Sequence, residues 1–367
     1  MAMKNIIFVV ATFVLFAGDV ISKRYPPMPI EDCPERCYCR DVDCLKEKGE
    51  LFCREVDFIC FNANVADRLD VLPVNTTRLS IIGENMGHIT LDMFSRFFEL
   101  KKLNLSQNSI RSLKITKAMR FLDFLNLDNN RLCYFPLEEM VKLLPALKIL
   151  KARHNNLTFL HDIQFPPRLV RLDLSNNHIE SPVKGSFRRL KKLEFLNLAN
   201  NSIREIHPVA FRHLKKLQIL DLDRNQITQL LPGSFAHLPS ISFLSLRHNR
   251  IEFIGQKAFR QIGVRWHGQH QIRLEHNRIK ILRKESIDVL FSRRDIYSLY
   301  LAGNPIFCDC GMMLIRDTAG DMLRDADTTL CHSPSDLKGF YVGDLDFPGC
   351  VEEEEDNYED DYYDDYY

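Results

Sequence analysis

The residues with the clearest chemistry stand at the end of the chain. Residues 351–367 contain ten carboxylates and five tyrosines, with no lysine or arginine. This segment has almost no aliphatic side chain to bury, so it is predicted to be disordered. Each tyrosine lies among acids in an accessible segment, which are conditions in which tyrosine is sulfated, at Tyr358, Tyr362, Tyr363, Tyr366 and Tyr367. A sulfate would add a fixed negative charge and acceptors that suit lysine and arginine.

Such an acidic tail is expected to bind basic partners, with an affinity that falls as salt is raised. It could instead fold back onto basic residues of the same chain, attract calcium weakly, or serve only to keep the protein soluble.

The body of the chain has a net charge opposite to that of the tail. The whole sequence has 49 basic and 49 acidic residues, but the tail holds ten of the acids, so the remainder is basic.

The first residues predict secretion. Lys4 precedes an apolar run over residues 6–16, and Val20 and Ser22 give the small-residue spacing that signal peptidase prefers. Cleavage is expected after Ser22. No later stretch of the sequence is apolar over the length of a transmembrane helix, and the acidic end does not suit a lipid-anchor signal. Sequons for N-glycosylation in this secreted chain begin at Asn75, Asn104, Asn156 and Asn200.

Cysteine usage agrees with an oxidising compartment, because ten of the eleven cysteines crowd toward the two ends. We predict disulfide-stapled caps from Cys33, Cys37, Cys39, Cys44, Cys53 and Cys60 at one end and from Cys308, Cys310, Cys331 and Cys350 at the other. The sequence leaves the pairing of the first six open, and zinc at the first three is a weaker alternative. Cys133 lies between the clusters and is predicted to be a buried free thiol or to form an intermolecular disulfide.

A repeat of the form L-x-x-L-x-L-x-x-N-x-L/I dominates the sequence. Its asparagines recur every 22 to 28 residues, at Asn108, Asn130, Asn155, Asn177, Asn201, Asn225, Asn249, Asn277 and Asn304. Alternating leucines predict one short strand per repeat, and the asparagine amide can satisfy backbone groups that no strand partner reaches. A phenylalanine follows ten residues after four of the asparagines, which predicts a second apolar column through Phe187, Phe211, Phe235 and Phe259.

The pattern is typical of an α/β leucine-rich repeat solenoid. Such an array has a curved parallel β-sheet on its concave face, an irregular or short helical convex side and a cap at each end. We expect a signal peptide at 1–22, a cysteine-rich N-terminal cap at 23–62, about ten repeats at 63–306, a C-terminal cap at 307–350 and a disordered tail at 351–367.

The array and its caps resemble the secreted small leucine-rich proteoglycans and related matrix proteins. The opening CPERCYC has the spacing of that family's N-terminal cap, and the closing GNPIFCDC resembles the C-terminal cap of chondroadherin. This resemblance implies the pairs Cys308–Cys331 and Cys310–Cys350. The acidic tail is similar to that of osteoadherin, and sulfation of such stretches in the family implies sulfation here. The chain departs from the family pattern in having more cysteines in its first cluster. It also has no Ser-Gly dipeptide, so a glycosaminoglycan chain is not expected.

The residues between the strand leucines should face the concave side as continuous columns, since neighbouring strands lie about 4.8 Å apart. An exposed apolar stripe is predicted beside an amide and carboxylate stripe, and such a patch with a polar rim usually marks a protein-binding site. Alternatively, these apolar side chains pack only against one another, or they form the interface of a homodimer. The predicted partner-binding residues are Phe124, Ile149, Phe195, Ile219 and Phe243, together with Asn126, Asp173, Asn197 and Asp221.

Two consecutive loops are strongly basic and should merge into one positive ridge. Heparan sulfate or another polyanion would suit this ridge, although an ordinary solvated surface is an equal alternative. The candidate residues are Arg188, Arg189, Lys191, Lys192, Arg212, Lys215 and Lys216. Histidines precede several repeat asparagines, and His248 and His276 could share a metal, but solvent-facing positions are the stronger interpretation, so we predict no metal.

No nucleophile elbow, phosphate-cradling loop or H-E-x-x-H motif occurs, so the sequence predicts neither an enzyme nor a cofactor. We expect a secreted extracellular matrix glycoprotein that acts as a protein-binding adaptor. The resemblance implies collagen or other matrix proteins as ligands of the concave face and adds growth factors as candidates, while basic partners suit the tail. Nucleic acid is not expected. The alternative is a diffusible growth-factor-binding antagonist or an innate immune recognition protein.

Overall fold

The computed structural model describes residues 37–47, 50–61, 69–72, 74–159, 165–181, 185, 187–208, 210–265, 268–291 and 297–346. The predicted signal peptide, Cys33, Cys350 and the tyrosine-rich tail lie outside the described residues. The five segment boundaries therefore stay a prediction. Within the described ranges, no helix combines the length and the apolar character needed to cross a bilayer.

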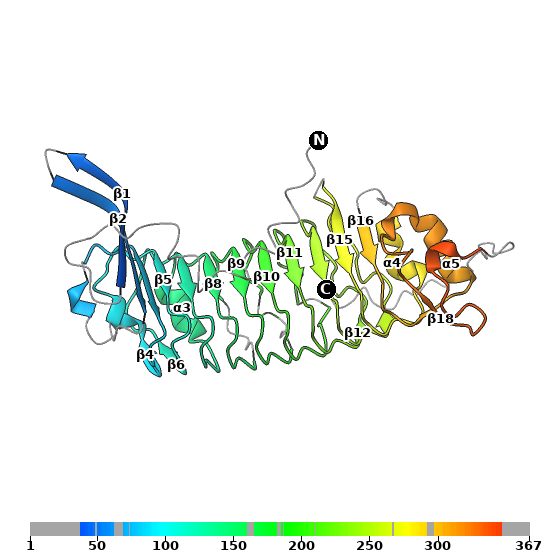
Figure 1. The fold of residues 1–367 in the computed structure, drawn as a ribbon, viewed down its shortest axis with the longest axis horizontal. Coiled ribbons are helices and arrows are strands. Elements are labelled where there is room, and N and C mark those ends of the chain that lie inside the picture. Colours follow the sequence, from blue (N-terminus) through cyan, green and yellow to red (C-terminus); the bar gives the residue numbers. More distant parts are fainter. Residues whose placement is uncertain are drawn as a thin grey trace.

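One twelve-stranded sheet runs through the molecule, and the loops that connect its strands lie on the opposite side (Figure 1). All neighbouring strands are parallel except the first pair, which is an antiparallel hairpin. The solenoid predicted from the repeat is confirmed. In spatial order the strands are β1 (Cys37–Glu47), β2 (Glu50–Phe61), β3 (Arg78–Ile82), β5 (Lys102–Asn104), β7 (Phe124–Asn126), β8 (Ile149–Lys151), β9 (Arg171–Asp173), β10 (Phe195–Asn197), β11 (Ile219–Asp221), β13 (Phe243–Ser245), β15 (His270–Arg273) and β16 (Tyr297–Tyr300).

The side opposite the sheet is largely irregular, with short elements only. Three pairs of short parallel strands lie outside the main sheet: β4 (His88–Thr90) with β6 (Ser112–Lys114), β12 (Gln229–Leu230) with β14 (Phe253–Ile254), and β17 (Ile306–Phe307) with β18 (Cys331–Ser333). The described helices are α3 (Leu137–Leu143), α4 (Lys284–Phe291) and α5 (Cys310–Ala319), with single 3₁₀ turns at Leu69–Val71, Leu91–Phe94, Gly320–Met322 and Val342–Asp344.

The short strands alternate as a two-residue period requires. In each three-residue strand from β5 to β13 the central leucine is buried, while the first residue of the strand faces the concave surface. These leucines pack into one continuous core that runs from the first hairpin to the C-terminal cap. Because each coil can bury its apolar face only against its neighbours, the array is stable only as a stack.

The nine repeat asparagines form a second continuous feature, the asparagine ladder. Each side chain is at most 7% exposed. Asn225 shows the arrangement: Nδ2 donates to the carbonyls of Leu198 and Leu222, at 2.9 and 3.0 Å, and Oδ1 accepts from the backbone N–H of Ile203 at 3.1 Å. The side chain therefore ties its own coil to the preceding one, satisfying backbone groups where the strand has ended.

The residue that precedes each ladder asparagine adopts a left-handed backbone conformation. Examples are Asn176, Arg224 and His248, with φ of 56°, 55° and 54°. This conformation costs free energy for any residue except glycine, although asparagine tolerates it best. The turn at every coil is therefore held against local preference by the ladder bonds.

The predicted phenylalanine column is confirmed and is longer than the sequence predicted. Rings of Phe187, Phe211, Phe235 and Phe259 stack with centroids 5.8 to 6.1 Å apart. Phe165 extends the stack by one coil, 6.2 Å from Phe187. All five rings are buried. The steps on this side are longer than the spacing of about 4.8 Å between strands, and that difference makes the sheet the concave face.

The N-terminal cap is the β1–β2 hairpin, whose second strand pairs with β3 and so covers the first coil. A disulfide joins Cys37 to Cys60, which are cross-strand neighbours in the hairpin. This pairing settles one of the connections that the sequence left open. Cys44 lies directly opposite Cys53 in the backbone register of the same hairpin.

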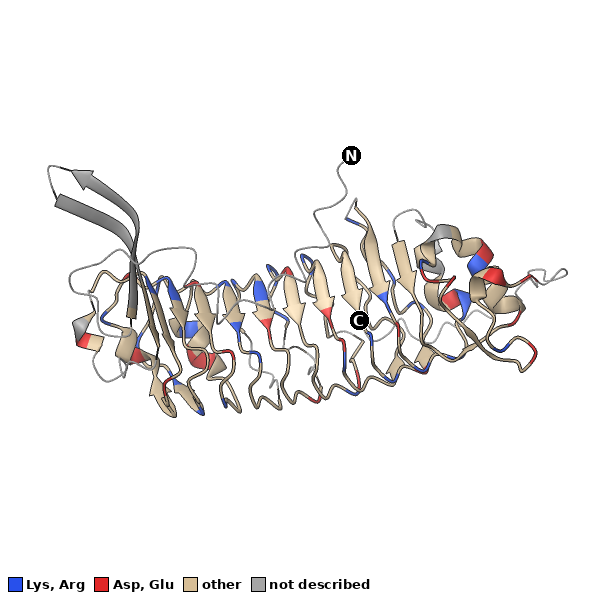
Figure 2. Cartoon of the chain, in the orientation of Figure 1, with Lys and Arg blue, Asp and Glu red and all other residues tan. Residues whose placement is uncertain are grey.

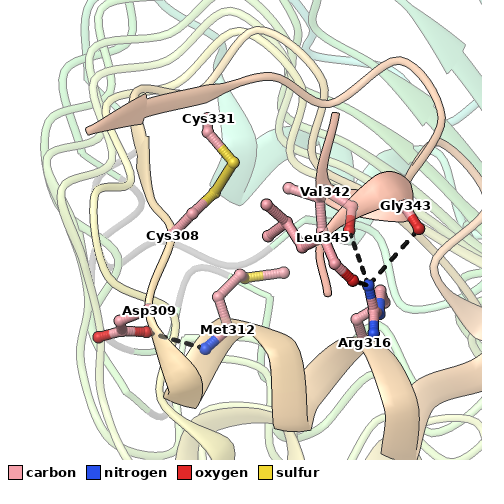
Figure 3. The surroundings of a disulfide bond; sticks show 8 residues. All are labelled: Cys308, Asp309, Met312, Arg316, Cys331, Val342, Gly343 and Leu345. Atoms are coloured by element: carbon pink, nitrogen blue, oxygen red, sulfur yellow. Dashed lines mark hydrogen bonds between the residues drawn. A yellow bond between two sulfur atoms is a disulfide. The ribbon is translucent and has the colours of Figure 1, made fainter. Parts of the chain in front are cut away.

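The C-terminal cap is closed by the Cys308–Cys331 disulfide, as the family resemblance implied (Figure 3). Cys310 is disulfide-bonded as well, and its expected partner Cys350 lies outside the described residues. Asp309 caps helix α5, because its carboxylate accepts the backbone N–H of Met312 at 2.9 Å. Arg316, one turn further along, donates to the carbonyls of the segment that follows the disulfide, at Val342, Gly343 and Leu345 (Figure 3).

The ladder should dominate the stability of the array. We expect Asn225→Ala to lower the free energy of unfolding by about 3 kcal/mol, because buried carbonyl and N–H groups on two coils lose their partners. Gln229→Ala, at an exposed position of the same coil, is the matched control and should change stability little. Urea unfolding followed by circular dichroism measures both variants. Equal unfolding midpoints for the two variants would contradict this account of the ladder.

Candidate binding face

Both columns predicted for the concave face are confirmed by the strand register. The first contains Lys102, Phe124, Ile149, Arg171, Phe195, Ile219, Phe243, Gln271 and Ser298. The second contains Asn104, Asn126, Lys151, Asp173, Asn197, Asp221, Ser245, Arg273 and Tyr300. Lysine and arginine as well as aspartate positions lie on the strands of this sheet (Figure 2).

The apolar stripe of the first column is less exposed than the sequence predicted. All five members are only half-buried rather than exposed, at Phe124, Ile149, Phe195, Ile219 and Phe243. At the three phenylalanines, long cationic side chains from the two columns lie over the rings. A sequence pattern places these residues on the concave face but does not show what covers them.

Three cations cover the aromatic rings of the stripe. Cζ of Arg171 lies 4.2 Å from the centroid of the Phe195 ring. Nζ of Lys151 lies 5.9 Å from Phe124, and Arg273 lies 5.7 Å from Phe243 and 4.8 Å from Tyr300. At these distances the cation is attracted by the ring quadrupole, so each contact stabilises an ordered pair of side chains. The face is therefore a mixture of aromatic and cationic groups.

The amide and carboxylate side chains of the second column each make the same type of hydrogen bond to the backbone. In each case Oδ1 accepts the backbone N–H two residues further along, at 2.9 to 3.1 Å. This local turn is a preferred conformation for asparagine and aspartate. One oxygen of each side chain is thus committed to the backbone, and a partner would meet the other polar atom, at Asn104, Asn126, Asp173, Asn197 and Asp221.

A third column, which contains three separate carboxylates among arginine and small residues, was missed by the sequence reasoning. Asp128, Asp223 and Glu275 each follow the second strand leucine directly, so the repeat spacing alone could have identified them. Asp128 accepts the N–H of Arg153 at 2.7 Å, and Asp223 accepts that of Arg247 at 2.8 Å. These aspartates therefore join consecutive coils.

Burial and neighbouring carboxylates raise the pKa of several carboxyl groups on this part of the face. Burial raises the pKa of Asp221 from its usual 3.8 to about 7, and the adjacent charges of Asp223 and Asp173 add to the effect. Burial also raises the pKa of Asp128, and it raises that of Glu275 although Arg273 and Arg247 oppose the change. The columns thus bring carboxylates together where water is partly excluded.

The described sequons occupy different surfaces. Asn104 lies within the second column, on strand β5, and is half-buried. Asn75, Asn156 and Asn200 are exposed, and Nδ2 of Asn200 donates to Oδ1 of Asn176 at 2.6 Å. Glycosylation stays a prediction at all four positions, but only Asn104 would carry a glycan on the concave face.

Cys133 corrects one of the two alternatives that the sequence left open. The thiol is not buried but exposed and free in the single chain, because the residue follows the buried Leu132 and so points outward from the coil. An intermolecular disulfide at this position stays a prediction. The rings of His248 and His276 stack with centroids 4.5 Å apart. Among the described residues, no group of three or more potential metal ligands was found.

The titration of Asp221 gives a test of the concave geometry. Between pH 4 and 7 the folded protein retains a proton that the unfolded chain releases, so this group should make stability fall as pH rises through that window. Asp221→Asn keeps the Oδ1 acceptor, as Asn197 does on the next strand. We expect the variant to match the parent protein near pH 4 and to be more stable at pH 8 by about 2–4 kcal/mol.

Thermal or urea unfolding across this pH range measures the effect. Asp336→Asn, at an exposed position of the C-terminal cap, is the control for removing a carboxylate. A stability difference between Asp221→Asn and the parent that is the same at every pH would argue against the raised pKa.

The chain was compared with known proteins. The leucine rich repeat family model matches residues 145–203 and 196–251. A leucine-rich repeat protein of Leptospira interrogans is 23% identical over 67% of each chain, with a TM-score of 0.49. A chain of the Toll–Spatzle complex, described as a molecular hub in Drosophila development and innate immunity, is 18% identical over 74% of this chain and 48% of that chain, with a TM-score of 0.52.

The described chain thus aligns with about half the length of the chain from the Toll–Spatzle complex. No curated protein sequence matches significantly. Identities at this level are informative about fold alone. Together with the twelve-stranded sheet and the asparagine ladder, the family match shows that the protein is a leucine-rich repeat solenoid, a fold that typically serves in protein binding and recognition.

Proposed function

We propose that this protein is a secreted extracellular matrix glycoprotein that binds other proteins through its concave face and has no enzymatic activity. The observation that carries the proposal is the set of cation-covered rings at Phe124, Phe195 and Phe243. Aromatic and arginine side chains are the residues most enriched at protein-binding hot spots. Ordered pairs of this kind also lose little side-chain entropy when a partner binds.

Collagen or another fibrous matrix protein is the proposed ligand. The support comes from the family resemblance of the caps and from the length of the face, which follows one continuous series of strands (Figure 1). An elongated ligand could contact many coils at once, so that modest contacts on each coil add together. The acidic tail, which we predict to be sulfated, is proposed to bind basic partners separately, because its charge is opposite to that of the body.

The position of Asn104 restricts where the ligand would bind. A glycan on this residue would stand on strand β5 and cover the first strands of the face. The described cation–ring pairs at Arg171 and Arg273 lie further along, on β9 and β15. We therefore propose that the ligand engages the part of the face from β7 to β16, which includes all three cation-covered rings.

Co-sedimentation with collagen fibrils tests this proposal. Arg171→Glu should reduce the bound fraction about five- to tenfold, because it removes a central cation and places a carboxylate over Phe195. Arg189→Glu makes the same charge change on an exposed loop outside the sheet and should bind as the parent does. A chain ending at residue 350 should also pellet, since the repeat face carries the binding.

Three other results would redirect the proposal. If Arg171→Glu and Arg189→Glu bind equally well, the concave face is not the collagen site. If only the full chain pellets, the tail is the anchor. Absence of binding by every form would remove collagen as the ligand and favour a diffusible binding protein.

A further inference from the structure

Four consecutive coils carry loops that contain no aspartate or glutamate. These loops are residues 181–193, 207–217, 231–241 and 255–265, and together they contain eleven lysines and arginines. Loops elsewhere in the array differ, since residues 91–101 contain Asp92 and Glu99 and residues 135–148 contain Glu138 and Glu139. We call these four loops the basic band. It includes the ridge predicted from the sequence and continues for two further coils.

The phenylalanine column sets the positions of the charges in this band. Each loop contains one ring of the column, so residues at the same distance from the ring lie on the same line along the solenoid. Arg188, Arg212 and Arg260 each follow their ring directly, and Lys191 and Lys215 each lie four residues after it. Neighbouring rings are 5.8 to 6.1 Å apart. The first two loops therefore carry cations one coil apart, and Arg260 continues the arginine line two coils after Arg212.

The cations of the band have little compensation from acids. No ion pair joins any described lysine or arginine of these loops to a carboxylate of the described chain. Burial lowers the pKa of His213, and the charges of Arg212, Arg188, Lys215 and Lys191 lower it further. Burial, Arg265 and Arg212 likewise lower the pKa of Lys215. Three of the four coils thus contribute cations to one positive field.

A hollow of about 430 Å³ interrupts the band at its third loop. It is lined by Lys215, His237, Pro239, Gln261, Val264 and Arg265. The hollow exists because the third loop has Ala236, Pro239 and Ser240 where the first two loops have arginine and lysine.

Contacts within the described chain hold this hollow in shape. Nζ of Lys215 donates to the carbonyl of His237 at 3.1 Å, and the His237 ring lies 2.5 Å from Oε1 of Gln261. The backbone N–H of Arg265 donates to the carbonyl of Pro239 at 2.7 Å. Cations on two coils therefore flank a space that is large enough for an anionic group.

We propose that the basic band binds a sulfated glycosaminoglycan, with one sulfated sugar seated in the hollow and the polymer lying along the coils. A linear polyanion fits because cations lie on both sides of the hollow, on the two coils before it and the coil after it, whereas a single anion would use the hollow alone. Sulfate groups accept several hydrogen bonds from lysine and arginine at once. The band lies on the loops opposite the sheet, so a polysaccharide and a protein ligand of the concave face could bind together. This inference shares with the proposed function only the prediction of secretion.

Affinity for immobilised heparin tests the proposal. We expect the full chain to bind at about 0.15 M salt and to be released as salt is raised. Lys191→Glu combined with Lys215→Glu should weaken binding on the order of tenfold. The matched control is Lys114→Glu with Lys117→Glu, two exposed lysines outside the band, which makes the same change in net charge and should retain most of the affinity. Chemically desulfated heparin should not bind.

The outcomes separate this proposal from the collagen proposal. Arg171→Glu should leave heparin binding unchanged, while the double variant at Lys191 and Lys215 should leave collagen binding unchanged. Equal losses in the double variant and its control would show only a general charge effect and would overturn the assignment to the band. Heparin binding that occurs only after residues 351–367 are removed would reassign the band to the acidic tail of the same chain. Failure of every form to bind, including the chain without these residues, would overturn the proposal.

Discussion

The asparagine ladder is the constraint on which the rest of this structure depends. A strand of three residues leaves most of the backbone of a coil without a sheet partner, and the ladder supplies those partners through buried side-chain amides. It also holds the preceding residue in a left-handed conformation that few side chains adopt freely. Each coil is thereby closed in the same way. Consequently the leucines of the sheet side and the phenylalanines of the loop side come into register over the length of the array.

This register organises the surface into columns, and columns place similar residues beside one another. On the concave face the result is a row of rings covered by cations, beside carboxylates such as Asp173, Asp221 and Asp223. On the loop side the result is a band of cations without acids. A single substitution in a solenoid therefore changes one step of a column, whereas a ligand contacts several steps at once. Both proposed ligands are elongated molecules for this reason.

The ends of the array need a different solution, because an open coil would expose its core. At the first end a hairpin joined by Cys37–Cys60 adds two strands and covers the coil. At the second end helix α5 and the Cys308–Cys331 disulfide cover the last strand, with Arg316 binding the carbonyls of the final described segment. The cysteine clusters of the sequence mark where each cap lies, but the hairpin is visible only in three dimensions.

The sequence by itself determined the solenoid, the membership of both concave columns and the phenylalanine column. It could do so because the same pattern recurs every 22 to 28 residues, so position within the repeat defines position in space. The tertiary structure decided what each side chain meets. It covered the aromatic stripe with cations, exposed Cys133, paired Cys37 with Cys60 and raised the pKa of Asp221 to about 7. These properties depend on the side chains of neighbouring coils, whose lengths and orientations the repeat pattern does not specify.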